Sequence, residues 1–77
     1  MEVFCERIKI LREEKKMTQK QVGIAINIDE SQYRRYELGQ RTNPTKETLI
    51  KMADIFNTSI DYLVGRSDTR HPEREWV

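Results

Sequence analysis

With 77 residues, the chain has room for one small core but not for two. A charged fraction of 35% beside an apolar fraction of 36% is typical of a soluble helical domain. There is neither a signal-peptide pattern nor an apolar run of roughly 20 residues, and the single cysteine, Cys5, cannot form an internal disulfide, so we expect a cytoplasmic protein that does not enter a membrane.

A formal net charge of +1 lacks the bulk basicity that often marks nucleic-acid-binding proteins. The distribution of charge matters more. Basic residues lie in or beside the central stretch, at Lys15, Lys16, Lys20, Arg34, Arg35 and Arg41, and a set of acidic residues lies toward the tail, at Asp54, Asp61, Asp68, Glu73 and Glu75. We therefore expect a local positive face whose binding to DNA depends strongly on salt.

The first predicted helix runs from about Val3 to Lys15. Phe4, Ile8, Leu11 and Lys15 recur at helical spacing, and this pattern predicts a stripe that faces the core.

Two short helices joined by a tight turn are predicted between residues 17 and 37. Thr18 can accept a backbone N–H of the first turn while Gln21 reaches back, as in a capping box. Asn27 follows where the chain must turn, because asparagine tolerates the left-handed conformation. The core face of the first of these helices is predicted to contain Val22, Ala25 and Ile26.

The next helix is expected to begin after Asp29 as its N-cap. Tyr33 and Tyr36 lie one turn apart on one face of it. The opposite, outward-facing side is polar and carries Glu30, Ser31, Arg34 and Arg35.

Gly39 is the predicted end of the third helix, and two further helices follow after a polar connection. Thr45 is the predicted N-cap of the fourth, and Ser59 begins a short fifth helix that ends before Gly65. The buried face of the fourth helix is predicted to contain Leu49, Met52, Ala53 and Phe56. The predicted fold class is therefore all-α, a compact five-helix domain over residues 1–65. Residues 66–77 are predicted to form a polar, flexible C-terminal tail, in which Trp76 is the one large apolar side chain that does not fit a solvated segment.

In this order and spacing, the motifs resemble the helix-turn-helix domain of the phage repressor/Cro (XRE-like) type. The likeness extends from about Phe4 to Gly65. The residues that carry it are Arg12, Thr18-Gln19, Gly23, Asn27-Ile28-Asp29, Tyr36-Glu37-Leu38-Gly39, Pro44, Leu49, Ala53 and Ile60-Asp61-Tyr62-Leu63-Val64-Gly65.

The resemblance implies that the third helix enters the major groove of DNA, where each base pair presents a distinct pattern of donors and acceptors. Arg35 matches a family position that reaches base edges and can bind guanine, while Glu30 can accept from cytosine N4 or serve only as a first-turn partner of the helix dipole. Gln32 lies at the edge of this face. The expected base-contacting residues are Glu30, Ser31, Gln32, Arg34 and Arg35.

The resemblance also implies contacts to phosphate at the N-terminus of the second helix and in the loop after the third. The expected phosphate-contacting residues are Thr18, Gln19, Arg41, Thr42 and Asn43.

Arg12 and Glu37 are implied to form a structural ion pair, either buried or exposed. A glycine inside a helix, such as Gly23, lowers helix stability by roughly 1 kcal/mol relative to alanine. Either the second and third helices cross so closely at Gly23 that a larger residue would not fit, or the glycine is merely tolerated.

The sequence contains few of the residues and motifs that catalysis requires. One histidine and one cysteine far apart, with no metal-spaced cluster, phosphate loop or nucleophile motif, predict no enzyme activity, no catalytic residues, no metal and no cofactor.

The expected function is that of a sequence-specific DNA-binding transcriptional regulator, a repressor that binds a near-palindromic operator as a homodimer. The family implies dimer contacts at the end of the fourth helix and in the fifth, at Thr58, Tyr62 and Val64. The alternative is an antitoxin-like protein-interaction module, or a regulatory protein partner bound through apolar residues off the core stripe, such as Ile10 and Ile24, or through Trp76.

Overall fold

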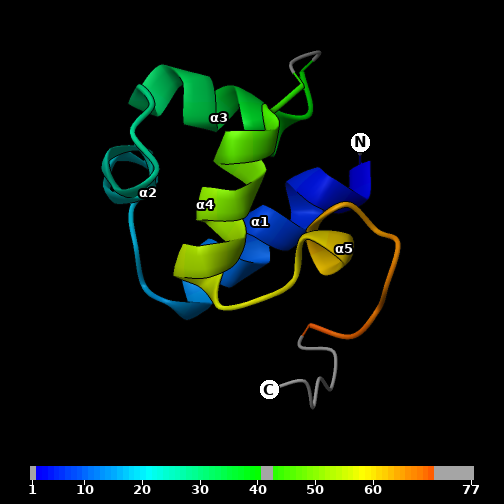
Figure 1. The fold of residues 1–77 in the computed structure, drawn as a ribbon. Helices are drawn as coiled ribbons and strands as arrows, with labels where there is room; N and C mark the ends of the chain where they lie inside the picture. The colour runs from blue at the N-terminus through cyan, green and yellow to red at the C-terminus, as the bar shows by residue number, and fades with distance from the viewer. Residues whose placement is uncertain (1, 41–42, 71–77) are drawn as a thin grey trace.

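The computed structural model describes residues 2–40 and 43–70, and within these ranges every regular element is a helix. The helices are α1 (Glu2–Glu14), α2 (Gln19–Ala25), α3 (Glu30–Leu38), α4 (Lys46–Phe56) and α5 (Ile60–Leu63). Figure 1 shows α2 and α3 at one end of the domain, α4 crossing in front of α1, and α5 beside α1. The prediction of an all-α, five-helix domain is confirmed.

Local signals in the sequence set most helix ends. Thr18 and Gln21 form the predicted capping box, and Thr45 and Ser59 each accept a backbone N–H of the helix that they begin. Asn27 has a φ of 62°, so it takes the left-handed conformation expected at the turn, and Gly39 ends α3 with a φ of 78°.

Three local expectations differ from the structure. Lys15 lies beyond the end of α1 and is exposed, because Lys16 takes a positive φ and turns the chain away from the helix. Ala25 is exposed, while its neighbour Ile26 points into the core. Asp29 occupies the N-cap position of α3, but its side chain makes no capping hydrogen bond.

One apolar core holds the helices together, and each of them contributes to it. The Tyr33 and Ile8 side chains are completely buried at its centre, and the Phe4 and Tyr36 rings meet edge to face at 6.1 Å. The buried apolar residues are Phe4, Ile8, Leu11, Val22, Ile26, Tyr33, Tyr36, Met52, Ala53, Phe56 and Leu63. Leu49, predicted in the same set, is partly buried and packs against it.

The chain after α5 contacts the rest of the domain as far as the structure describes it. Residues 66–70 run back along the domain below α5 (Figure 1). The Arg70 guanidinium pairs with both carboxylate oxygens of Glu14. The backbone carbonyl of Arg70 accepts a hydrogen bond from Ser59 N at 2.8 Å. Arg7 donates to the Ser67 carbonyl at 2.7 Å. Residues 71–77, including Trp76, lie outside the described ranges.

Candidate nucleic-acid interface

The turn between α2 and α3 fixes the angle at which α3 is presented. Gly23 lies where the two segments approach, since a Cβ there would stand only 3.0 Å from the Ile28 carbonyl oxygen. Ile28 N donates to the Gly23 carbonyl at 2.9 Å and closes the turn. The close approach is one of the two explanations that the sequence left open for this glycine, and the structure supports it.

The buried face of α3 determines which of its side chains reach solvent. Because Tyr33 and Tyr36 are held in the core, the opposite side of the helix must point outward. Ser31, Arg34 and Arg35 are exposed on that side.

Glu30 and Gln32 lie at the margins of this exposed face, and both are partly buried. Gln32 Nε2 donates to the Tyr36 hydroxyl at 3.2 Å, so this side chain is directed along the helix toward the core. Of the five residues predicted to contact bases, Gln32 is therefore the one that the structure turns away from the others.

The Arg34 side chain is hydrogen-bonded to two neighbouring side chains. Its Nη2 donates to Glu30 Oε2 at 3.1 Å, one turn earlier in α3, and its Nε lies 3.4 Å from Gln19 Oε1 in α2. The structure gives the exposed Arg35 side chain no hydrogen bond or ion pair to the residues in the described ranges. The two neighbouring arginines thus differ in how freely they can reach DNA.

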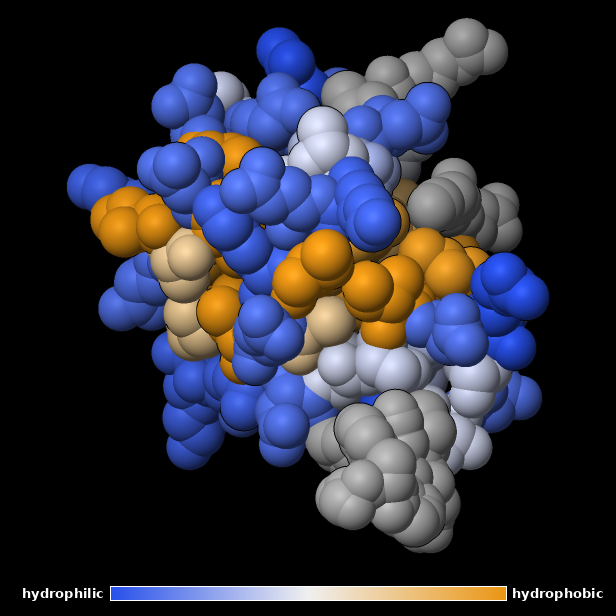
Figure 2. Space-filling model, viewed as in Figure 1, coloured by the Kyte–Doolittle hydropathy of each residue, from blue (hydrophilic) through white to orange (hydrophobic). Residues whose placement is uncertain are grey.

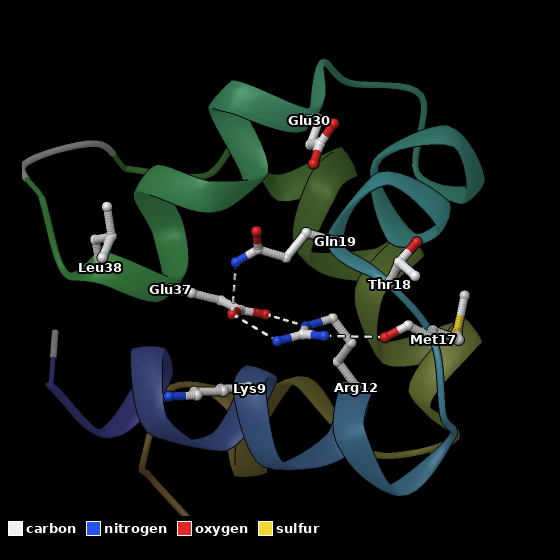
Figure 3. A pocket seen from close by; sticks show the side chains of 8 residues that line it. All are labelled: Lys9, Arg12, Met17, Thr18, Gln19, Glu30, Glu37 and Leu38. Atoms are coloured by element: carbon white, nitrogen blue, oxygen red, sulfur yellow. Dashed lines mark hydrogen bonds and ion pairs between the residues drawn. The ribbon is translucent and has the colours of Figure 1, made fainter.

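A buried polar network lies behind the exposed face, between α1, α2 and α3 (Figure 3). Arg12 Nε donates to Glu37 Oε2 at 2.6 Å and Arg12 Nη1 donates to the Met17 carbonyl at 2.9 Å. The side chains of Arg12 and Glu37 are only 14% and 4% exposed. Gln19 Nε2 completes the set by donating to Glu37 Oε1 at 3.0 Å.

This network alters the acidity of the groups in it. Burial raises the pKa of the Glu37 carboxyl, but the hydrogen bonds from Arg12 and Gln19 outweigh burial and leave that pKa below its usual range. The hydrogen bond to Glu37 raises the pKa of Arg12. Burial, and then the Glu37 carboxylate, raise the pKa of the Tyr33 hydroxyl. Glu37 is therefore ionised and fully engaged at neutral pH.

The residues predicted to contact phosphate are only partly covered by the structure. Thr18 is exposed, with its hydroxyl occupied by the capping box, and Asn43 is exposed in the connection to α4. Arg41 and Thr42 lie outside the described ranges.

The hydrogen bonds at both ends of the Gln19 amide could not be predicted from the sequence, because they depend on how α2 packs on α3. Lys9 was not among the residues predicted from the sequence. It lines the shallow cleft of Figure 3 together with Gln19, and its position three residues before Arg12 on the same helix was the available signal.

Other kinds of site are not suggested by the described residues. Nowhere in residues 2–40 and 43–70 do three or more histidine, cysteine, aspartate or glutamate side chains gather as metal ligands would. A membrane-spanning helix is also absent from these ranges, since none is both long and apolar enough.

Comparison with known proteins places these features in a family context. A family model described as Helix-turn-helix matches residues 8–63, which include both halves of the α2–α3 unit and the helices that support it. No solved protein structure matches the chain significantly.

Several curated relatives are similar over most of this chain. The uncharacterized HTH-type transcriptional regulator YobD of Bacillus subtilis is 32% identical over 73 residues, covering 95% of this chain and 64% of that protein. YqaE of the same organism, another uncharacterized HTH-type transcriptional regulator, is 39% identical over 69 residues, or 88% of this chain and 59% of that protein. The cryptic phage CTXphi transcriptional repressor RstR of Vibrio cholerae is 41% identical over 61 residues, or 79% of this chain and 54% of that protein. The matched part of this chain thus spans about half to two thirds of their length.

Proposed function

The chain belongs to the helix-turn-helix family, and from this membership we propose that it is a sequence-specific DNA-binding transcriptional regulator. One observation carries the proposal. With Tyr33 and Tyr36 buried, α3 presents an exposed side of hydrogen-bonding groups at the end of the domain, in Ser31, Arg34 and Arg35. A single helix with such a side fits the major groove.

The proposed base readers are the outward-facing residues of α3. The exposed Arg35 guanidinium can donate two hydrogen bonds to guanine O6 and N7, a contact that discriminates against other bases by roughly 1–3 kcal/mol. Glu30 uses one carboxylate oxygen for Arg34, which leaves the other oxygen for cytosine N4. Gln32 supports the helix through Tyr36 and contributes less.

The proposed phosphate contacts surround this face. Thr18 and the backbone at the start of α2 form one set. Asn43, with Arg41 and Thr42 added from the sequence, forms a second set in the connection after α3. Because Gln19 is held by Glu37 and Arg34, its side chain serves chiefly to position its neighbours. Lys9 contributes an exposed cation to the cleft that Gln19 lines.

We propose repression as the mode of regulation and a homodimer as the binding unit. The similarity to RstR, named as a transcriptional repressor, supports the first. A dimer would place two α3 helices in successive major grooves about 34 Å apart on a near-palindromic operator.

The proposed dimer contact is the face formed by α4 and α5. Figure 2 shows hydrophobic side chains gathered over these helices, where Ile50 and Ile60 line a shallow groove. Of the contacts that the family implied, Thr58 lines the same groove and donates to the Arg70 carbonyl, and Tyr62 lies under the Arg70 guanidinium.

The function is tested by selecting bound sequences from random duplex DNA at near-physiological salt. We expect an enriched, two-fold symmetric site. Arg35→Ala should flatten the preference at one position of each half-site, whereas Asn43→Ala should weaken binding to all sequences about equally. Equal loss of sequence preference in both variants would contradict the assigned roles, and no enriched site in the parent protein would contradict DNA reading itself.

A second candidate function, docking of a protein partner, is favoured by one observation. Ile24 in α2 is 70% exposed and Ile10 in α1 is 48% exposed, and large apolar side chains left in solvent are typical of contact surfaces when they form a patch. Pull-down with the parent protein and with Ile10→Glu and Ile24→Glu tests this alternative, which a stable one-to-one complex unaffected by Arg35→Ala would support.

A further inference from the structure

The two adjacent arginines of α3 have different surroundings, and the difference has consequences for specificity if the proposed function holds. Arg34 is held from two sides, by Glu30 in its own helix at 3.1 Å and by Gln19 in α2 at 3.4 Å. The Arg35 side chain has neither kind of contact to residues in the described part of the chain. One cation on the outward-facing side is restrained and the other is not.

The restraint is anchored in the interior of the domain. Gln19, which accepts from Arg34, donates with its other end to Glu37, a side chain only 4% exposed that is itself paired with Arg12. Gln19 is therefore fixed from behind and offers Arg34 a stationary acceptor. Glu30 adds a charged partner, in a pair whose two side chains are about half exposed.

An arginine restrained in this way is a poorer ligand for phosphate. Sequence-independent binding to DNA grows with the number of phosphates that lysine and arginine neutralise. For Arg34 to bind a phosphate, its guanidinium would have to break the ion pair with Glu30. The Glu30 carboxylate would then be unpaired beside the negatively charged DNA. Specificity is a ratio of affinities, and it improves when binding to the wrong sites is weakened.

We propose that Glu30 is a specificity-determining residue that acts through Arg34: its carboxylate holds the Arg34 guanidinium against α2 and so limits binding to DNA of unrelated sequence. The role rests on the proposed DNA-binding function and is separate from a contact between Glu30 and a base. Arg35, which carries no such restraint, remains the freer reader of bases.

The test compares Glu30→Gln, Arg34→Gln and the double variant with the parent protein. Glu47→Gln is a matched control, because Glu47 is also an acidic residue in the first turn of a helix and pairs with a cation four residues on, Lys51, at 3.6 Å. Binding of each protein to a duplex of unrelated sequence and to the selected operator is measured by fluorescence anisotropy over a series of salt concentrations. Circular dichroism verifies that each variant is folded.

Glu30→Gln should bind the unrelated duplex about twofold to fivefold more tightly, the range that corresponds to one surface ion pair. Its logarithmic salt dependence should steepen by ~0.9, as expected for one additional phosphate contact. Both changes should largely disappear when Arg34 is already Gln, and Glu47→Gln should show neither. The ratio of operator to unrelated affinity should fall in Glu30→Gln and stay unchanged in Glu47→Gln.

Two results would overturn the role of Glu30 while leaving DNA binding intact. One is an unchanged affinity of Glu30→Gln for the unrelated duplex. The other is an equal gain in the Arg34→Gln background, which would mean that Glu30 repels phosphate directly and does not act through Arg34. If the parent protein selects no operator at all, the proposed function fails, and the specificity role fails with it.

Discussion

The Arg12–Glu37 pair places two opposite charges inside the domain, with the carboxylate almost completely removed from solvent. Loss of one partner from a buried pair leaves an uncompensated charge, and this typically costs about 3–5 kcal/mol, whereas an exposed pair contributes less than about 1 kcal/mol. We expect Arg12→Leu to lower the free energy of unfolding by about 3–5 kcal/mol, the range for a buried pair, measured by urea denaturation at neutral pH. A loss below about 1 kcal/mol would show that the pair behaves as an exposed one.

The same pair determines how stability responds to acid. Because the pKa of Glu37 is depressed in the folded domain, its contribution is present above the ordinary glutamate pKa of about 4.3 and is lost as the pH falls through the lower, folded value. The slope of stability against pH in this acidic window should therefore be smaller in Glu37→Gln than in the parent. Equal slopes would mean that Glu37 is not the group that takes up the proton.

At the scale of the element, the sequence predicted helices best where a local signal determines the backbone. Thr18 with Gln21, Asn27 and Gly39 each take the predicted conformation, because capping hydrogen bonds and left-handed turns depend on neighbours within a few residues. The exposure of Ala25 could not be predicted in this way. Which face of a short helix is buried depends on the direction from which the next helix approaches.

The crossing of α2 and the turn before α3 gives a prediction for Gly23. In an open helix, Gly→Ala would stabilise by about 1 kcal/mol, but here the new Cβ would lie 3.0 Å from the Ile28 carbonyl oxygen and 3.4 Å from Glu30 N. Both neighbours are backbone atoms, so α3 would have to shift. We expect Gly23→Ala to destabilise the domain by about 1–3 kcal/mol, measured by thermal unfolding.

The control for Gly23→Ala is the reverse exchange at an exposed position of the same helix. Ala25→Gly should cost about 1 kcal/mol through helix propensity alone. Stabilisation by Gly23→Ala would mean that the turn adapts easily and that the glycine is merely tolerated. If α3 does shift as expected, binding to the selected operator should weaken more in Gly23→Ala than in Ala25→Gly.

At the scale of the whole molecule, the outward face of α3 could be predicted and the network behind it could not. The polar side followed from the spacing of Tyr33 and Tyr36. Gln19, by contrast, bonds to Arg34 and Glu37, which lie 15 and 18 residues further along the chain. No periodic pattern relates residues at such separations, so the restraint on Arg34 became visible only with the packing of α2 against α3.

The same limit applies to residues 66–70, whose polar composition indicated a tail and whose partners lie both in α1 and in the segment around α5. Arg7 binds the Ser67 carbonyl and the Asp68 carboxylate, and it also stacks on the Tyr62 ring at 4.0 Å. Arg70 reaches Glu14 from 56 residues away. The segment thus ties the short helix α5 to α1, which four helical residues could hardly achieve by their own hydrogen bonds.

A comparison of two shortened chains tests this tie. A chain that ends at Arg66 loses the bonds from Ser67, Asp68 and Arg70, whereas a chain that ends at Arg70 keeps them. Each such bond contributes about 1 kcal/mol and water partly replaces it, so we expect the shorter chain to be less stable by about 2 kcal/mol in urea denaturation. Because α5 forms part of the proposed dimer face, the shorter chain should also dimerise less well in sedimentation. Equal stability of the two chains would show that the segment rests on the domain without supporting it, and that α5 is held by Leu63 and its other core contacts alone.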